Sequence, residues 1–155
     1  MVSEGANTRI HGDAKGWNFF FPKDQQQVQK KHVQPFLFID MQWTGRGHPL
    51  QDVAYALTTT LDQDTLPKMD LLVDHYVDRL DIRLREKGEV LNTQNLRRQY
   101  DQVWLDYSRV IVTGLWKRLD SESMIKNKEK VGPSMINRSW PHVLFITNRI
   151  CKLLF

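Results

Sequence analysis

Two short apolar runs separated by a polar connection predict a β-hairpin near the start of the chain. The runs occupy residues 19–21 and 36–39, and each has the length of a strand rather than of a helix. Pro22 and Pro35 bracket the connection, and proline cannot donate to a strand ladder. We therefore expect two antiparallel strands joined by a segment rich in Gln and Lys.

The pattern then changes to a helical period, which predicts four helices over 52–61, 67–87, 93–119 and 141–154. Pro67 suits a first helical position, and Gly88 suits a helix end. Segment 120–139 is polar and predicts a loop. The expected apolar positions are Leu71, Leu72, Tyr76, Leu80 and Leu84 on the second helix, and Leu96, Tyr100, Val103, Trp104, Tyr107, Ile111, Leu115 and Leu119 on the third.

The length and composition fit one globular domain. The chain has 155 residues, of which 41% are apolar and 26% charged. This is enough for one hydrophobic core and too little for two. The predicted fold class is α+β and mostly α, with a short β-hairpin followed by a helical bundle.

Charge and cysteine usage narrow the partners and the compartment. The formal net charge is +4, but basic and acidic residues are interleaved, which favours a small anionic ligand or none and argues against nucleic acid. Cys151 is the only cysteine, so we expect no intrachain disulfide, a reducing compartment and a buried thiol. No signal peptide or membrane-spanning run is recognisable. We expect a soluble, cytoplasmic protein with no membrane partner.

The residues with most chemical information surround the predicted hairpin. Asp13 is followed five residues later by Asn18, and Asp40 comes directly after the second apolar run. Phosphoryl transfer needs a carboxylate to orient and deprotonate a hydroxyl, and oxygen ligands for Mg²⁺ on the nucleotide phosphates. Taken singly, Asp40 and Asn18 also fit turn residues, and Asp52 fits a helix N-cap. Together, Asp13, Asn18 and Asp40 would supply this set of groups from one hairpin region.

The segment His11–Gly12–Asp13 followed by Asn18, and the segment Ile39–Asp40–Met41–Gln42, resemble the catalytic and metal-binding loops of the protein-kinase-like superfamily. The glycine after the histidine, together with Ile-Asp-x-Gln, is similar to the aminoglycoside phosphotransferase and choline-kinase-like group, including its ecdysteroid-kinase-like branch. The likeness runs from His11 to about Leu61. It is a poorer match to protein kinases, which have Arg and Phe-Gly where this chain has Gly12 and Gln42.

The resemblance implies a role for each matching residue. Asp13 would be the catalytic base, Lys15 would contact the transferred phosphate, and Asn18 and Asp40 would bind Mg²⁺. The cofactors implied are Mg²⁺ and ATP as co-substrate, and the acceptor is a hydroxyl of a small molecule. No cofactor-binding residue beyond the metal ligands is identifiable.

The resemblance also implies two supporting residues. Asp52 would brace the catalytic loop through its backbone, and His11 would pack beneath that loop rather than meet substrate.

Five tryptophans raise the alternative of a cage for a quaternary ammonium substrate. Helical spacing with Tyr100 and Tyr107 places Trp104 in the core, and we expect most of the others to be core residues as well. Trp17 and Trp43 flank the candidate site and stay candidates for such a cage.

Only ten residues precede His11, too few for a glycine-rich loop and its strand lysine. Residues 1–155 are therefore expected to form a partial domain, the C-terminal lobe of the kinase-like fold without its ATP-binding N-terminal lobe. Residues 1–61 would hold the catalytic and metal-binding segment, and 62–155 the helical substrate side.

Two functions fit such a chain. One is a small-molecule phosphotransferase with little activity as this chain alone, and the other is a non-catalytic binding or scaffold module. A partner chain covering an exposed cleft fits both functions.

Overall fold

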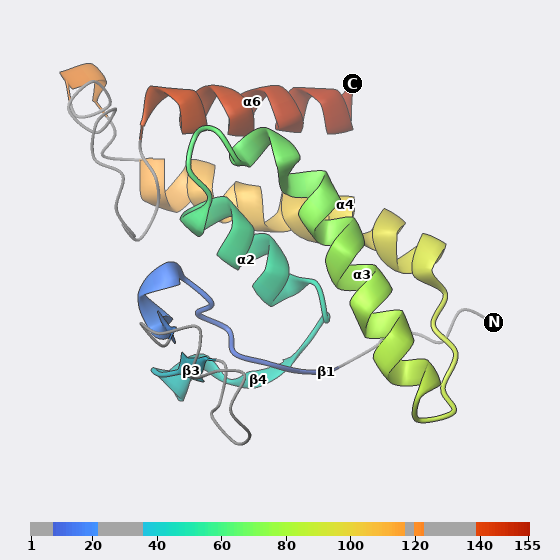
Figure 1. Cartoon of the computed structure of the whole chain (residues 1–155). Helices are drawn as coiled ribbons and strands as arrows, with labels where there is room; N and C mark the ends of the chain where they lie inside the picture. The colour runs from blue at the N-terminus through green and yellow to red at the C-terminus, as the bar shows by residue number, and fades with distance from the viewer. Residues whose placement is uncertain (1–7, 22–35, 117–119, 123–138) are drawn as a thin grey trace.

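The computed structural model describes residues 8–21, 36–116, 120–122 and 139–155, and helices dominate this part of the chain. The long helices are α2 (Gln51–Thr60), α3 (Met69–Arg85), α4 (Thr93–Val110) and α6 (Trp140–Leu154). In Figure 1 the strands lie on one side of α2, while α4 and α6 lie on its other side. The described chain is α+β and mostly α, as predicted.

Short turns connect these elements and carry part of the candidate site. The 3-10 turns are η1 (Gly16–Asn18), η2 (Met41–Trp43) and η3 (Leu66–Lys68). A π-helical turn, η4 (Ile111–Leu115), continues α4.

Two small antiparallel sheets hold the N-terminal third together. Strand β2 (Phe19–Phe20) pairs with β3 (Leu37–Phe38), with Phe19 opposite Phe38, which confirms the predicted hairpin. Strand β1 (Thr8–Ile10) pairs with β4 (Gly45–Gly47), with Arg9 opposite Arg46. This second pair was not predicted, because a Gly-Arg-Gly segment has the composition of a loop.

The hydrophobic core lies between the four long helices. Trp104 and Tyr100 of α4 are completely buried, and the Trp104 indole donates to the Thr58 hydroxyl of α2 over 3.1 Å. The apolar face predicted for α4 is confirmed as far as it is described. Other buried members of the core are Leu50, Ala54, Leu66, Met69, Val73, Val77, Leu96, Ile111 and Ile146.

The face predicted for α3 was partly wrong. Leu71 and Leu72 are 67% and 39% exposed, whereas Met69, Val73 and Val77 are buried. Residues four apart share a helix face, so the buried stripe follows these three residues and leaves the two leucines outward. Tyr76 and Leu80 are partly buried beside the stripe, as expected.

The helix ends agree with the sequence where they are described. Gly88 adopts φ +78° just after α3, the left-handed conformation that glycine favours at a helix end. Asn92 caps α4, accepting from the backbone N–H of Asn95 at 2.9 Å. Residues 117–119, at the end of the predicted helix 93–119, and most of the predicted loop 120–139 lie outside the described residues.

An ion-pair network joins α6 to α3 and α4. Arg149 donates to both carboxylate oxygens of Asp70 at 2.9 Å and to Asp101 at 3.0 Å. Arg97 also donates to Asp70, at 2.7 Å. The Arg149 guanidinium lies 5.1 Å from the ring of Trp104, so the network sits directly against the core.

Cys151 and Trp140 of α6 are more exposed than the sequence predicts. Cys151 is exposed on α6 rather than buried, because α6 turns Ile146 and not Cys151 toward the core. Trp140 is 51% exposed at the start of the same helix. No helix among the described residues is long and apolar enough to span a membrane.

His142 is a buried histidine of α6 that couples stability to pH. It is 1% exposed, with Nε2 2.7 Å from the carbonyl oxygen of Leu61 and Nδ1 3.0 Å from the Ser139 hydroxyl. Burial lowers the pKa of His142 more than the Leu61 hydrogen bond and the charge of Asp62 raise it. Since the unfolded chain then binds a proton that the folded chain does not, stability is lost as the pH falls below the ordinary histidine pKa of about 6.5.

We expect the urea midpoint of the wild-type protein to fall more steeply than that of His142→Gln between about pH 7.5 and about pH 5.5. Glutamine keeps an N–H donor for the Leu61 carbonyl and does not titrate, so it isolates the histidine contribution. Equal falls in the two proteins, measured by urea denaturation at both pH values, would contradict this assignment.

Candidate active site

The loop between β1 and β2 carries the His11–Gly12–Asp13 motif, and the path of its backbone depends on Gly12. Gly12 adopts φ +84°, and a Cβ at this position would overlap the backbone carbonyl oxygen of Trp43 in η2. Only glycine allows this approach. The loop that bears Asp13 is therefore packed directly against the turn that follows Asp40.

Asp52 binds the backbone of this loop. Its two carboxylate oxygens accept from the N–H groups of His11 and Gly12 at 2.6 Å and 3.0 Å. Asp52 lies in the first turn of α2, yet the N-cap position is Leu50 and has no side-chain cap bond. The carboxylate thus joins the N-terminus of α2 to the loop instead of capping its own helix.

His11 links the two chain segments of the site. Its Nδ1 accepts from the N–H of Asp13 at 3.3 Å, and its Nε2 lies 2.9 Å from the carbonyl oxygen of Ile39. This pattern assigns the proton to Nε2, which donates to Ile39. The ring is 7% exposed and packs against Phe38 with centroids 5.4 Å apart. The imidazole therefore lies beneath the loop, between Asp13 and the residue before Asp40.

The Asp13 carboxylate is held by three side chains. Oδ1 accepts from the Tyr55 hydroxyl at 2.9 Å, and Oδ2 accepts from Lys15 Nζ at 2.5 Å and from Asn18 Nδ2 at 3.2 Å. Asn18 also donates to the carbonyl oxygen of Asp13 at 2.8 Å. Asp13 is only 8% exposed, so its orientation is fixed by these contacts.

The same contacts set the charge state of Asp13. Burial raises the pKa of this carboxyl, but hydrogen bonds from Lys15, Tyr55 and Asn18 and the charge of Lys15 lower it more. The net pKa lies below the ordinary aspartate value, so Asp13 is ionised at neutral pH. Lys15, whose side chain is 18% exposed, provides the neighbouring positive charge.

Asn18 and Asp40 lie on adjoining backbone segments. The N–H of Ile39 donates to the carbonyl oxygen of Asn18 at 3.1 Å, which places Asp40 one residue beyond this contact. Asp40 is exposed and adopts a left-handed conformation, with φ 62°. Within the described segments, no group of three or more His, Cys, Asp or Glu residues is arranged to hold a metal ion.

A protein-family comparison matches the segment that carries this site. The model of the ecdysteroid kinase-like family matches residues 2–89, more than half of the chain. The chain belongs to the ecdysteroid kinase-like family. The match includes all six residues singled out from the sequence, from His11 to Asp52. No curated protein and no solved structure matches the chain.

Tyr55 is a residue of the candidate site that sequence reasoning missed. Its hydroxyl contacts Asp13 across 42 residues of sequence, and its ring packs on Tyr107 with centroids 4.8 Å apart. Burial and the Asp13 carboxylate raise the pKa of Tyr55, so the phenol stays protonated and donates. In the sequence it appears only as one apolar position of a helix, and its spacing from Asp52 would have been the available signal.

The two tryptophans kept as cage candidates lie at the surface of the kinase-like segment. Trp17 of η1 is 57% exposed, and Trp43 of η2 is 66% exposed. The hairpin beside them also exposes apolar side chains, including Phe20 and Leu37 at 52% and 59%. The contact of Trp17 and Trp43 with a ligand stays a prediction, as does a partner chain that covers the exposed surface.

Proposed function

We propose that this member of the ecdysteroid kinase-like family is a phosphotransferase that moves the γ-phosphate of ATP to a hydroxyl of a small molecule. The observation that carries the proposal is the Asp13 carboxylate, ionised, nearly buried and oriented by Tyr55, Lys15 and Asn18. Such a group fits the residue that receives the acceptor hydroxyl.

Asp13 acts mainly through orientation. A carboxylate with a lowered pKa is a weak base, but phosphoryl transfer needs little proton removal before the new P–O bond begins to form. The acceptor hydroxyl donates to Asp13 and passes its proton to the carboxylate as its oxygen bonds to phosphorus. Tyr55 and Asn18 hold the two carboxylate oxygens in place for this step.

Lys15 contributes charge at the same position. Its ammonium group is paired with Asp13 and partly open to solvent. With ATP present, we assign it to the oxygens of the transferred phosphoryl group, whose negative charge needs a nearby cation.

Asn18 and Asp40 are proposed as the Mg²⁺ ligands. Both supply oxygen, the ligand type that Mg²⁺ takes, and the remaining positions suit phosphate oxygens and water. The Asn18 amide nitrogen is engaged by Asp13, which leaves its oxygen available for the metal. When bound, Mg²⁺ would neutralise charge on the β- and γ-phosphates.

A small-molecule acceptor follows from the resemblance of the two motif segments to known kinase groups. Gly12 and Gln42 favour the aminoglycoside phosphotransferase and choline-kinase-like enzymes over protein kinases. We assign the chain to the C-terminal side of a kinase-like fold on this basis.

Isothermal titration calorimetry tests the proposal by measuring ATP binding with and without Mg²⁺. We expect Mg²⁺-dependent binding that weakens on the order of 10–100-fold in Asp40→Ala, because one oxygen ligand is lost. Asp13→Asn, which is not a metal ligand, should keep this binding. Circular dichroism melts of each variant verify that the chain is folded.

Three outcomes are informative. Binding lost only in Asp40→Ala supports the assignment. Absence of binding in a folded wild-type sample would instead favour a non-catalytic binding module. Equal loss in both variants would remove the distinction between a metal ligand and a base.

A further inference from the structure

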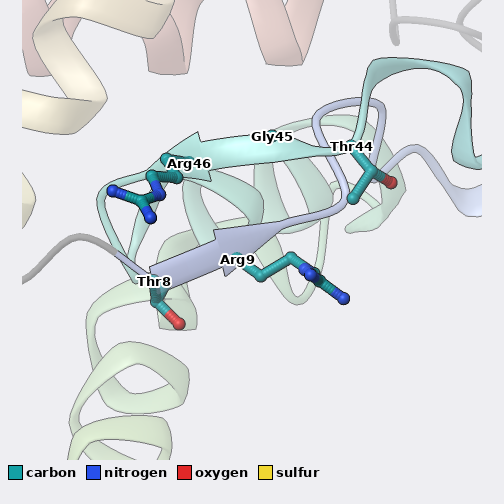
Figure 2. Close-up of a pocket in the computed structure, with 5 residues that line it drawn as sticks. All are labelled: Thr8, Arg9, Thr44, Gly45 and Arg46. Carbon is teal, nitrogen blue, oxygen red and sulfur yellow. The ribbon is translucent and has the colours of Figure 1, made fainter.

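A cavity lies on the β1–β4 strand pair. It has a volume of about 560 Å³ and is lined by Thr8, Arg9, Thr44, Gly45 and Arg46. None of these residues belongs to the proposed phosphotransferase site. Figure 2 shows both arginine side chains reaching away from the strand pair, toward opposite ends of it.

The strand register places two positive charges opposite each other. Arg9 and Arg46 are direct partners in the antiparallel pair, so their side chains leave the same face of the sheet. Ile10 is buried on the other face. A two-stranded sheet has little stability of its own, so a ligand that contacts both strands would stabilise it.

No acidic side chain of the described segments compensates these charges. Neither the Arg9 side chain nor the Arg46 side chain forms a hydrogen bond or an ion pair with another described residue. By contrast, the arginines of the helical network, Arg97 and Arg149, are both paired with aspartates. Both arginines are exposed, so their guanidinium groups can turn from the positions in Figure 2 toward one anion.

We propose that this cavity binds a phosphate group, either as free phosphate or as a phosphomonoester. The face that carries Arg9 and Arg46 offers two guanidinium groups and the Thr44 hydroxyl, and the lining residues include no carboxylate. Guanidinium groups bind phosphate through two parallel N–H···O bonds. A phosphate has enough oxygens to accept from both arginines and a hydroxyl at once, whereas a carboxylate has only two.

The position of the cavity connects it to the candidate active site without making it part of that site. Arg9 lies two residues before His11, and Thr44 directly follows η2. Strands β1 and β4 thus tie the Asp13 loop to the segment after Asp40. A phosphate joining Arg9 to Arg46 would strengthen that connection, so its binding stabilises the fold around both segments.

Calorimetric titration with inorganic phosphate, in the absence of Mg²⁺ and nucleotide, tests the proposal. We expect Arg9→Gln and Arg46→Gln each to weaken phosphate binding roughly tenfold or more, because each removes one bidentate contact. Arg98→Gln is the matched control: it removes one positive charge from an exposed position of α4 and should leave binding unchanged. Chloride at equal ionic strength controls for screening.

Thermal unfolding gives an independent readout. With phosphate, the wild type and Arg98→Gln should melt at a higher temperature than without it, and Arg9→Gln and Arg46→Gln should gain little. Phosphate binding that is unchanged in Arg9→Gln and Arg46→Gln, or equally weakened in Arg98→Gln, would overturn the proposal.

Two further arms identify the ligand and separate this site from the metal site. Methyl phosphate binding as tightly as phosphate indicates a phosphomonoester site, while weaker binding indicates free phosphate; acetate binding as tightly as either would overturn the phosphate assignment. Asp40→Ala should bind phosphate as the wild type does. If ATP does not bind but phosphate still does, the phosphate site is supported and the phosphotransferase proposal fails. If ATP binds but phosphate does not, only the phosphate-site proposal fails.

Discussion

Replacing Gly12 with alanine is expected to lower the free energy of unfolding by about 3 kcal/mol and to abolish Mg²⁺-dependent ATP binding. A Cβ at Gly12 would overlap the carbonyl oxygen of Trp43, and φ +84° is strained for any L side chain. Because the obstacle is backbone, it cannot turn aside as a side chain can. The loop must move, and Asp13 moves with it. Urea denaturation and calorimetry measure the two effects.

Gly88→Ala is the matched control for this experiment. Gly88 also has a positive φ, +78°, but an added Cβ there meets no atom within 4 Å. Gly88→Ala should lower the free energy of unfolding by about 1 kcal/mol, the cost of placing an L side chain at positive φ, and leave ATP binding intact. Equal losses of stability in the two variants would mean that the contact between Gly12 and Trp43 does not constrain the loop.

The helical part of the fold was predictable because burial there repeats with the helix. Trp104 and Tyr100 of α4 are four residues apart and share the buried face, as the spacing indicates. The same reasoning failed on α3, where Leu71 and Leu72 attracted attention by residue type alone. The buried stripe of α3 follows Met69, Val73 and Val77, which are four residues apart, and Leu71 and Leu72 lie outside it.

The strand pair β1–β4 was beyond local reasoning. Its partners are separated by more than thirty residues, and β4 contains two glycines, which weaken a strand by their own preference. The pairing depends on tertiary contacts: at Gly47 a Cβ would meet the side chain of Ile10. Small residues therefore allow β4 to approach β1. The local sequence pattern of residues 45–47 does not predict this pairing.

The candidate site shows the same division. Asp13, Asn18 and Asp40 could be selected because motif identity marks them. Tyr55 could not, since its contact with Asp13 joins a helix to a loop across 42 residues. The sequence left Asp52 open between an N-cap and a brace of the loop, because both uses place a carboxylate in the first turn of a helix. The structure decides between the two roles, because the Asp52 carboxylate oxygens point toward the N–H groups of His11 and Gly12.

Asp52→Ala is accordingly expected to lower the free energy of unfolding by about 3 kcal/mol, because two charge-assisted hydrogen bonds to backbone N–H groups are lost. The loss should concentrate in the loop. We expect the amides of His11 and Gly12 to exchange with solvent faster, and Mg²⁺-dependent ATP binding to weaken as Asp13 loses its fixed position. Hydrogen exchange followed by NMR, with calorimetry, measures both effects.

Asp62→Ala separates a loop-specific effect from a general loss of stability. The Asp62 carboxylate also accepts from two backbone N–H groups, those of Asp64 and Thr65, at 3.2 Å and 2.8 Å, but it lies after α2 and away from the loop. Its removal should speed exchange near η3 and leave the His11 and Gly12 amides protected. If Asp52→Ala changed exchange no more at the loop than Asp62→Ala does, the two hydrogen bonds of Asp52 would not be what positions Asp13.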